Sequence, residues 1–191
     1  MPLDSGLLVV ISAPSGGGKT TVVDRLVGRL PDAVRLVTTT SRTPRPNESP
    51  DVDYHFLSRR EFAEKIEAGE MVEHVEYAGH YYGIERSRLE ALLAGHRYVL
   101  APIDVRGRAN IAAAGVPHLS IFLLPESLAV LRERLERRPN AVPEEINERL
   151  AIAEREIALA REFDRQIFNR EGCLEETLSA VQKAVEELAM S

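Results

Sequence analysis

The chain has 191 residues, a formal net charge of −6, and 44 % apolar and 28 % charged residues. This size and composition suit one soluble domain with a hydrophobic core. The acidic balance argues against a nucleic-acid binder, since such domains are usually basic. The single cysteine, Cys173, excludes an intramolecular disulfide, which suits a reducing compartment. No stretch approaches the ~18 apolar residues of a membrane helix, so we expect a cytoplasmic protein without a membrane partner.

The first predicted element is a buried parallel strand at residues 7–11, a continuous apolar run. A glycine-rich turn follows, and the apolar spacing over 20–30 predicts a helix that Pro31 ends. Residues 34–40, rich in Val and Thr, predict a second strand. The stretch 41–53 shows no period and is rich in proline and charge. It predicts a loop, and loops of that length in compact domains usually serve a function.

Between residues 54 and 95 the pattern changes to short strands and short helices. Strands are predicted at 54–57, 71–77 and 80–84, and helices at 61–68 and 87–94. We interpret this region as a small α+β insertion.

The alternation of longer strands and helices then resumes. Strands are predicted at 98–104, 119–124 and 165–169. Helices are predicted at 107–114, from the cap Ser127 to about 137, at 144–163 and at 174–188, with a polar break at 139–143. Strands that alternate with helices predict a parallel sheet covered on both faces, the α/β class.

The most specific motif runs from Ala13 to Thr20 and nearly fits G-x-x-x-x-G-K-[ST], with alanine at the first glycine position. Glycines let backbone N–H groups converge on phosphate oxygens. We expect Lys19 to reach the β- and γ-phosphates and the Thr20 hydroxyl to ligate Mg²⁺. A glycine-rich turn with a chance Lys-Thr is the alternative, but the flanking strand and helix favour a nucleotide site. The predicted ATP-binding set in this motif is Ala13, Pro14, Ser15, Gly16, Gly17, Gly18, Lys19, Thr20 and Thr21.

A second candidate site lies in the proline-rich loop. Arg42 and Arg45 are three residues apart between turn-forming residues, and two guanidinium groups on one loop suit a phosphate monoester. Solvated loop arginines are the alternative.

In this setting the chain resembles the guanylate kinase family over nearly its whole length. The motifs that carry the resemblance are Pro14-Ser15-Gly16, the stretch 38–48, 53–56, 69–73, Gly79-His80-Tyr81-Tyr82-Gly83, 103–107, 121–127 and Arg134-Leu135. The resemblance implies a P-loop kinase fold in one domain. Its parts are a core of residues 1–37, 97–130 and 155–191, a GMP-binding insertion at 38–96 and a lid at 131–154. It implies transfer of the γ-phosphate of ATP to GMP with Mg²⁺ as cofactor, by a monomer or homodimer.

The resemblance also implies roles for single residues. The acceptor phosphate would be held by Arg42, Arg45, Tyr54 and Tyr82, with Glu48 supporting the loop. Glu73 and Thr38 would read guanine, and Asp104 would lie near the base and the metal. Lys19, Arg42, Arg134, Arg138 and Arg149 would be catalytic, the last three from the lid side, and Asn169 would lie near the adenine of ATP. Taken one by one, the tyrosines also suit half-buried strands, Glu73 suits a solvated strand, and the arginines suit exposed helix faces.

Four features depart from the family pattern, one of which is Arg106 where glutamine is usual. Ile84 stands where serine or threonine usually helps to hold guanine, and Pro102 stands where an aspartate is common. Arg170-Glu171 follows Asn169 where acidic residues are usual. These departures keep open a kinase for a ribose bisphosphate on the same scaffold. A non-catalytic, partner-binding guanylate kinase-like module is the other alternative, which the intact Gly18-Lys19-Thr20 disfavours.

Overall fold

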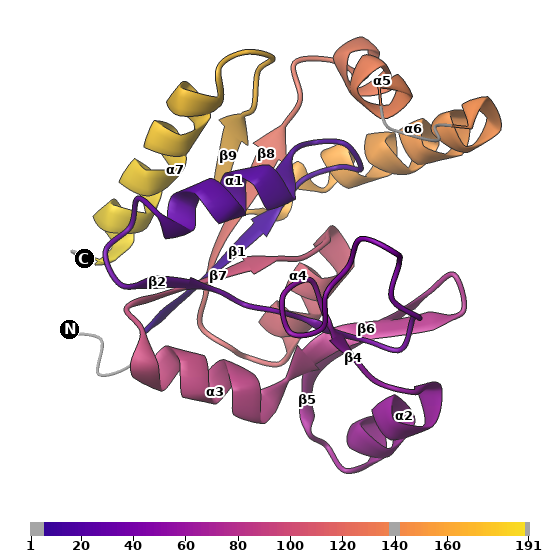
Figure 1. Ribbon diagram of the computed structural model, residues 1–191. Helices are drawn as coiled ribbons and strands as arrows, with labels where there is room; N and C mark the ends of the chain where they lie inside the picture. The colour runs from indigo at the N-terminus through magenta and orange to yellow at the C-terminus, as the bar shows by residue number, and fades with distance from the viewer. Residues whose placement is uncertain (1–5, 138–141, 190–191) are drawn as a thin grey trace.

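The computed structural model describes residues 6–137 and 142–189 of the chain (Figure 1). A central sheet of five strands, all parallel, has the order β2-β7-β1-β8-β9. Its strands are β1 (Leu7–Ser12), β2 (Ala33–Arg35), β7 (Tyr98–Pro102), β8 (Leu119–Leu124) and β9 (Arg165–Phe168). The predicted α/β class with a parallel sheet is therefore confirmed.

Helices cover both faces of this sheet, and the alternation of side chains along β1 shows how. Leu7, Val9 and Ile11 pack in one cluster with residues of α1 and α7, whereas Leu8 and Val10 pack in another with residues of α3 and α4. These helices are α1 (Lys19–Val27), α3 (Arg86–Gly95), α4 (Val105–Ala113) and α7 (Leu174–Ala189). A strand buried on both faces must be apolar at every position, which explains the continuous run in the sequence.

The neighbouring strands β1 and β7 are followed by helices on opposite faces of the sheet, α1 and α4. Such a reversal opens a crevice at the carboxyl ends of the strands, where parallel sheets bind ligands. The glycine-rich loop follows β1 at this edge.

The region between β2 and β7 forms a second, mixed sheet of four strands in the order β4-β3-β6-β5. Its elements are β3 (Thr39–Thr40), β4 (His55–Phe56), α2 (Arg59–Glu67), β5 (Met71–Tyr77) and β6 (His80–Glu85). In Figure 1 this sheet and α2 occupy the lower right part of the molecule, below the central sheet. The α+β character predicted for this region is confirmed.

Two helices, α5 (Leu128–Glu136) and α6 (Pro143–Ala158), lie beside each other above the crevice (Figure 1). Ser127 caps α5 as predicted, since its hydroxyl accepts from the N–H of Val130 at 3.2 Å. Most of the predicted polar break at 139–143 lies outside the described residues. Among the described helices, none combines the length and the apolar content that crossing a membrane requires.

Two predicted elements were wrong in extent. The strand predicted at 34–40 is two strands, because the chain leaves the parallel sheet after Leu36 and β3 pairs with β4 and β6 of the second sheet. The helix predicted at 144–163 ends at Ala158, and a 3₁₀ turn (Ala160–Glu162) follows. Phe163 then turns to extended backbone and packs edge-on against Phe122 of β8, with ring centroids 5.2 Å apart. Tertiary packing thus overrides helical periodicity there.

Candidate active site

The loop between β1 and α1 has the backbone geometry of a phosphate cradle. Gly16 and Gly18 both have φ of 85°, a conformation that side chains disfavour. The Gly17 N–H donates to Pro14 O at 2.8 Å, and a Cβ on Gly17 would lie 2.8 Å from the Cβ of Ala13. The chain therefore needs glycine at each of these positions, and alanine fits at position 13.

Lys19 is the first residue of α1 and directly follows the cradle. Burial lowers the pKa of its ammonium group, and the carboxylates of Asp104 and Glu156 counteract this shift. Thr20 and Thr21 in the first turn of α1 are exposed. The N-terminus of α1, whose first N–H groups have no acceptor among the described residues, thus lies beside one lysine and two exposed threonines, which suits an anionic ligand.

Glu156 of α6 is a residue at this site that the sequence reasoning missed. Its Oε2 is buried and has no hydrogen-bond partner among the described residues. Burial raises the pKa of Glu156, and the Lys19 ammonium opposes the rise. Its position seven residues after Arg149, two turns along the same helix face, is the signal that could have found it.

The proline-rich loop at residues 41–53 is held by a partly buried ion pair between Arg42 and Glu48. Arg42 Nη2 lies 2.8 Å from both carboxylate oxygens of Glu48, and the two side chains are 13 % and 14 % exposed. Glu48 also accepts from the backbone N–H of Arg45 at 2.9 Å. Arg45 itself is 72 % exposed. Glu48 therefore fixes the loop and the direction of Arg42, while the Arg45 guanidinium remains accessible.

Two tyrosines stand beside this arginine. The Arg42 guanidinium lies 5.6 Å from the centre of the Tyr54 ring, and the Tyr54 and Tyr82 rings meet edge-on with centroids 6.1 Å apart. Burial raises the pKa of Tyr54. The structure thus brings together Arg42, Glu48 and Tyr54, from the long loop and its end, with Tyr82 of β6.

Glu73 on β5 is an unusual carboxylate, because it is only 6 % exposed and its Oε2 has no hydrogen-bond partner among the described residues. Burial, with a smaller contribution from the nearby Asp104, raises the pKa of Glu73 to about 7. A Cβ on Gly107 would lie 3.4 Å from Glu73 Oε2 and 3.5 Å from Asp104 Oδ1. The lack of a side chain at Gly107 therefore leaves room beside both carboxylates.

The other residues around Glu73 have defined positions. Asp104 caps α4, since its Oδ1 accepts from the Gly107 N–H at 2.8 Å, and its side chain is 32 % exposed. Thr38 is partly exposed, and its hydroxyl has no partner among the described residues. Ile84 pairs with Glu73 across β5 and β6 but is 1 % exposed and belongs to the core cluster. The Ile84 side chain therefore packs in the hydrophobic core.

The structure does not gather the lid arginines at the cradle. Arg134 contacts Glu171 through Nε at 2.8 Å and the carbonyl of Asn169 through Nη2 at 3.0 Å. Arg149 pairs with Glu145 along α6 at 3.3 Å. Arg138 lies outside the described residues. Asn169 is 6 % exposed, and its side chain contacts Gly17 and Thr177.

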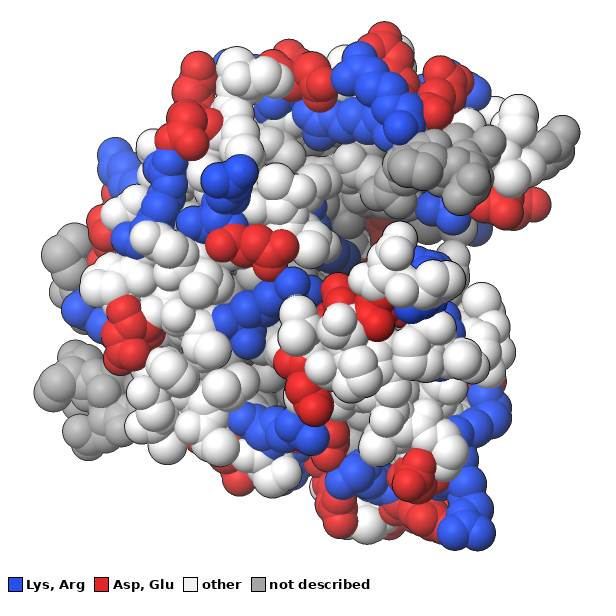
Figure 2. All heavy atoms as spheres, viewed as in Figure 1, with Lys and Arg blue, Asp and Glu red and all other residues white. Residues whose placement is uncertain are grey.

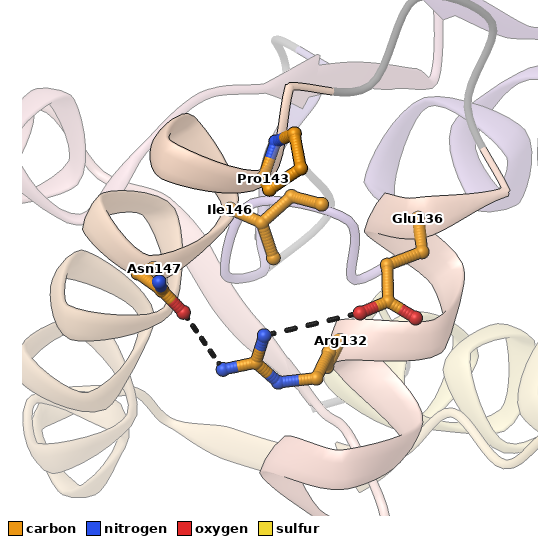
Figure 3. A pocket seen from close by; sticks show the side chains of 5 residues that line it. All are labelled: Arg132, Glu136, Pro143, Ile146 and Asn147. Carbon is orange, nitrogen blue, oxygen red and sulfur yellow. Dashed lines mark hydrogen bonds and ion pairs between the residues drawn. The ribbon is translucent and has the colours of Figure 1, made fainter.

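A cavity of about 340 Å³ lies elsewhere, between α5 and α6, and is lined by Arg132, Glu136, Pro143, Ile146 and Asn147 (Figure 3). Arg132 spans it, bonding to Asn147 at 2.9 Å and pairing with Glu136 at 3.8 Å. None of the candidate binding residues lines this cavity, so it belongs to the packing of the two helices.

The crevice between the two parts of the molecule is visible on the face shown in Figure 2. That face is hollowed between the part carrying α5 and α6 and the part carrying the insertion, and acidic and basic side chains are mixed around the hollow. A parallel sheet with a glycine-rich cradle after its first strand, and with a separate arginine-tyrosine cluster on an inserted sheet, defines the class of P-loop kinases.

Comparison with known proteins places the chain within this class. The family model described as guanylate kinase matches residues 5–188. The chain is 43 % identical to the guanylate kinase of Thermosynechococcus vestitus over 94 % of this chain and 93 % of that protein. It is 36 % identical to the guanylate kinase of Wolbachia sp. subsp. Brugia malayi, over 97 % and 91 %. The crystal structure of guanylate kinase from Anaplasma phagocytophilum superposes with a TM-score of 0.75 at 29 % identity, over 98 % of this chain and 88 % of that chain. The chain belongs to the guanylate kinase family.

Proposed function

We propose that this chain transfers the γ-phosphate of ATP to GMP, giving ADP and GDP. The observation that carries the proposal is the buried carboxylate of Glu73 on the inserted sheet, whose Oε2 has no hydrogen-bond partner among the described residues although Asn110 interacts with the group. A carboxylate accepts from both N1–H and the 2-amino group of guanine, and adenine offers no such pair of donors. A base that leaves this buried carboxylate without a hydrogen-bond partner would bind much more weakly, because the unpaired polar group costs free energy.

In the proposal, the acceptor phosphate binds to Arg42, Arg45, Tyr54 and Tyr82. The ion pair with Glu48 holds Arg42 in place, so little side-chain ordering remains when the ligand arrives. Thr38, with its accessible hydroxyl, supplies a second contact to the base.

The donor phosphates bind in the cradle formed by Ala13 to Thr21. Mg²⁺ is part of the proposal, and the residues present fit it. Thr20 offers an exposed hydroxyl, and no cluster of three metal-ligating side chains was found among the described residues. This suits Mg²⁺, which takes few protein ligands and binds mainly to water and substrate phosphates. When bound, the ion neutralises charge on the triphosphate.

The chemical step in the proposal is a direct in-line transfer. A phosphate oxygen of GMP attacks the γ-phosphorus, the bond from that phosphorus to the β,γ-bridging oxygen breaks, and ADP leaves. Such a transfer requires positioning and charge neutralisation more than a catalytic base. Lys19 supplies positive charge in the cradle, and Arg134, Arg138 and Arg149 supply it from the lid side. Arg134 and Arg149 first leave the contacts described above.

The proposal also includes closure of the insertion and the lid over the core. The insertion, residues 38–96, and the lid, residues 131–154, would close over the core and exclude water from the transfer. Within the lid, α5 already contacts the cradle, since a Cβ on Gly16 would lie 3.1 Å from the Leu135 side chain.

We further propose purine nucleotide metabolism in the cytoplasm as the setting, because the two substrates occur there. A ribose bisphosphate would leave the buried Glu73 without a partner, and a non-catalytic module would not need Lys19.

The test of the proposal is the Lys19→Met variant. We expect turnover of Mg·ATP and GMP to fall by several orders of magnitude, with the urea unfolding midpoint unchanged. Lys183→Met on α7 is the matched control, since Lys183 is 77 % exposed and we expect full activity. Near-normal turnover of a folded Lys19→Met protein would contradict the proposal.

A further inference from the structure

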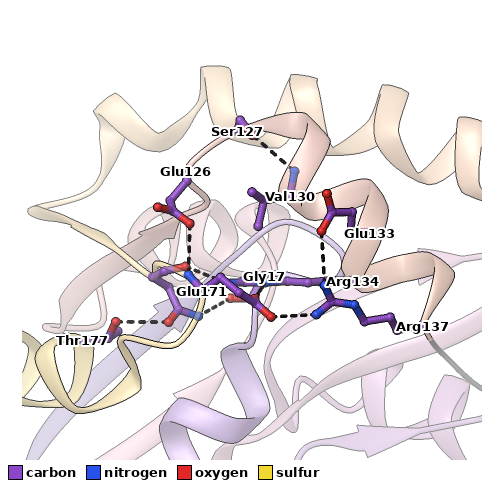
Figure 4. Close-up of polar contacts among 10 residues, drawn as sticks. Gly17, Glu126, Ser127, Val130, Glu133, Arg134, Arg137, Glu171 and Thr177 are labelled. Carbon is purple, nitrogen blue, oxygen red and sulfur yellow. Dashed lines mark hydrogen bonds and ion pairs between the residues drawn. The ribbon is translucent and has the colours of Figure 1, made fainter.

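Asn169 follows β9 and makes a direct contact with the phosphate cradle. Its side-chain Nδ2 donates to the carbonyl oxygen of Gly17 at 2.8 Å, and both groups are buried. The opposite orientation of the amide would place its oxygen against another carbonyl oxygen, so the donor must face Gly17. On its other side, Asn169 Oδ1 lies 3.1 Å from the hydroxyl of Thr177, which is 1 % exposed. Figure 4 shows Gly17 and Thr177 linked through this network.

The contact with Gly17 fixes more than one atom, because the Gly17 carbonyl and the Gly18 N–H belong to the same peptide group. That group is planar and trans, as are the other peptides of the described residues, so the two bonds point in opposite directions. Holding the carbonyl toward Asn169 turns the Gly18 N–H away from it. No described residue accepts a hydrogen bond from this N–H. Gly18 is the N-cap residue of α1 and directly precedes Lys19.

Asn169 is itself held from several sides. Its backbone N–H donates to Leu124 O of β8 at 2.8 Å, and its carbonyl accepts from Arg134 of α5 at 3.0 Å. A Cβ on Gly18 would lie 2.6 Å from Asn169 Nδ2. The asparagine therefore lies in tight contact with the peptide it would orient, and its own position depends on β8, α5 and α7.

We propose that Asn169 is a positioning residue that orients the Gly17–Gly18 peptide so that the Gly18 N–H faces the donor phosphates. This role differs from contact of the side chain with adenine, because Nδ2 already donates to the Gly17 carbonyl and Oδ1 lies within reach of the Thr177 hydroxyl, which also reaches the carbonyls of Phe168 and Cys173. It rests on phosphate binding in the cradle, a part of the proposed function, and does not depend on which acceptor is used.

The experiment measures dissociation constants of Mg²⁺ complexes with three ligands by calorimetry: ATP, ITP and inorganic tripolyphosphate. Asn169→Ala leaves the Gly17 carbonyl unpaired and frees the peptide to rotate. We expect affinity for all three ligands to fall by the same factor, about tenfold, in line with the loss of one buried hydrogen bond. Binding of GMP should change by less than about twofold.

The result separates the two roles of Asn169, because tripolyphosphate has no base. A loss confined to ATP, with tripolyphosphate unchanged, would show contact with the base and overturn the proposal. Unchanged affinity for all three ligands would overturn it as well. Since tripolyphosphate binding needs no acceptor, this test stays informative even if GMP proves not to be the acceptor.

A second pair of variants covers the case in which Asn169→Ala does not fold. Thr177→Val removes the hydroxyl at nearly constant shape, and Thr177→Ser keeps it. We expect about a threefold loss for all three ligands in Thr177→Val and near wild-type affinity in Thr177→Ser. Equal affinities of the two Thr177 variants would contradict the proposed network.

Discussion

At the scale of single residues, the central feature is the buried carboxylate of Glu73. We predict that Glu73→Gln raises the KM for GMP about 100-fold, because an amide cannot accept from both guanine donors and presents one donor of its own. The KM for ATP should stay within about twofold. Steady-state kinetics with each substrate varied in turn provides the measurement.

The matched control for this prediction is Glu76→Gln. Glu76 lies three residues further along β5, and its side chain is 50 % exposed and paired with Arg59. We expect this control to leave both KM values unchanged. An equal rise in the KM for GMP in both variants would show that β5 is merely perturbed and that Glu73 does not read the base.

The raised pKa of Glu73 also predicts a dependence of stability on pH. The carboxyl titrates near 4.5 when unfolded and near 7 in the folded protein. Between these values the folded protein keeps a proton that the unfolded chain loses, so this residue's contribution to stability falls as pH rises from about 4.5 to 7. Glu73→Gln has no such titration. We predict that its stability relative to wild type improves by up to about 3 kcal/mol between pH 4.5 and 8.

Urea unfolding without nucleotide, at several pH values across this range, measures the effect. The exposed Glu76→Gln control should parallel the wild type. If wild type and Glu73→Gln show the same pH slope, Glu73 does not carry the perturbed carboxyl.

At the scale of elements, the start of α2 shows how the inserted sheet is completed. Ser58 and Glu61 form a capping box, with Glu61 N to Ser58 Oγ at 3.2 Å and Ser58 N to Glu61 Oε2 at 2.7 Å. We predict that Ser58→Ala destabilises the protein by about 1 kcal/mol in urea unfolding. Turnover should be unchanged, because α2 carries none of the candidate site residues.

Ser87→Ala near the start of α3 is the control for this helix cap. Ser87 is exposed, and the N-cap of α3 has no side-chain hydrogen bond, so we expect a change within about 0.5 kcal/mol. A similar loss in both variants would rule out the capping box as the cause.

The elements that the sequence predicted best are those determined by local pattern. The buried run of β1, the strand β8 at Leu119–Leu124 and the Ser127 cap all depend on periodicity or on one side-chain bond. The break between β2 and β3 could not be predicted, since it depends on which sheet each strand pairs with. The end of α6 likewise depends on the packing of Phe163 against Phe122.

The same division applies to the candidate site. The cradle is encoded within one short segment, so its glycines and Lys19 could be located from the sequence. The resemblance implied that Glu48 supports its loop, whereas its partners, Arg42 and the backbone N–H of Arg45, came from the structure. The contact of Asn169 with Gly17 joins residues 152 positions apart, and Glu156 approaches Lys19 from α6. The partners in such long-range contacts cannot be read from the local sequence pattern, although the spacing of Glu156 from Arg149 marks the helix face on which it lies.

At the scale of the whole molecule, the fold separates two tasks. The central sheet and α1 present the cradle for the donor, and the inserted sheet presents the arginine-tyrosine cluster and Glu73 for the acceptor. Holding two anionic substrates against each other requires positive charge from both sides and exclusion of water. In the proposed function, base selection depends on Glu73 and Thr38, since Ile84 carries no hydroxyl.

The most direct test of the account is a comparison of acceptors. Purified protein with Mg·ATP is assayed for ADP release in the presence of GMP, dGMP, AMP, CMP, UMP or ribose 1,5-bisphosphate. We predict turnover largely confined to GMP and dGMP, since these present the guanine edge that Glu73 can bind. Equal turnover of several bases, or turnover with ribose 1,5-bisphosphate alone, would contradict the assignment of guanine as the base that this site reads.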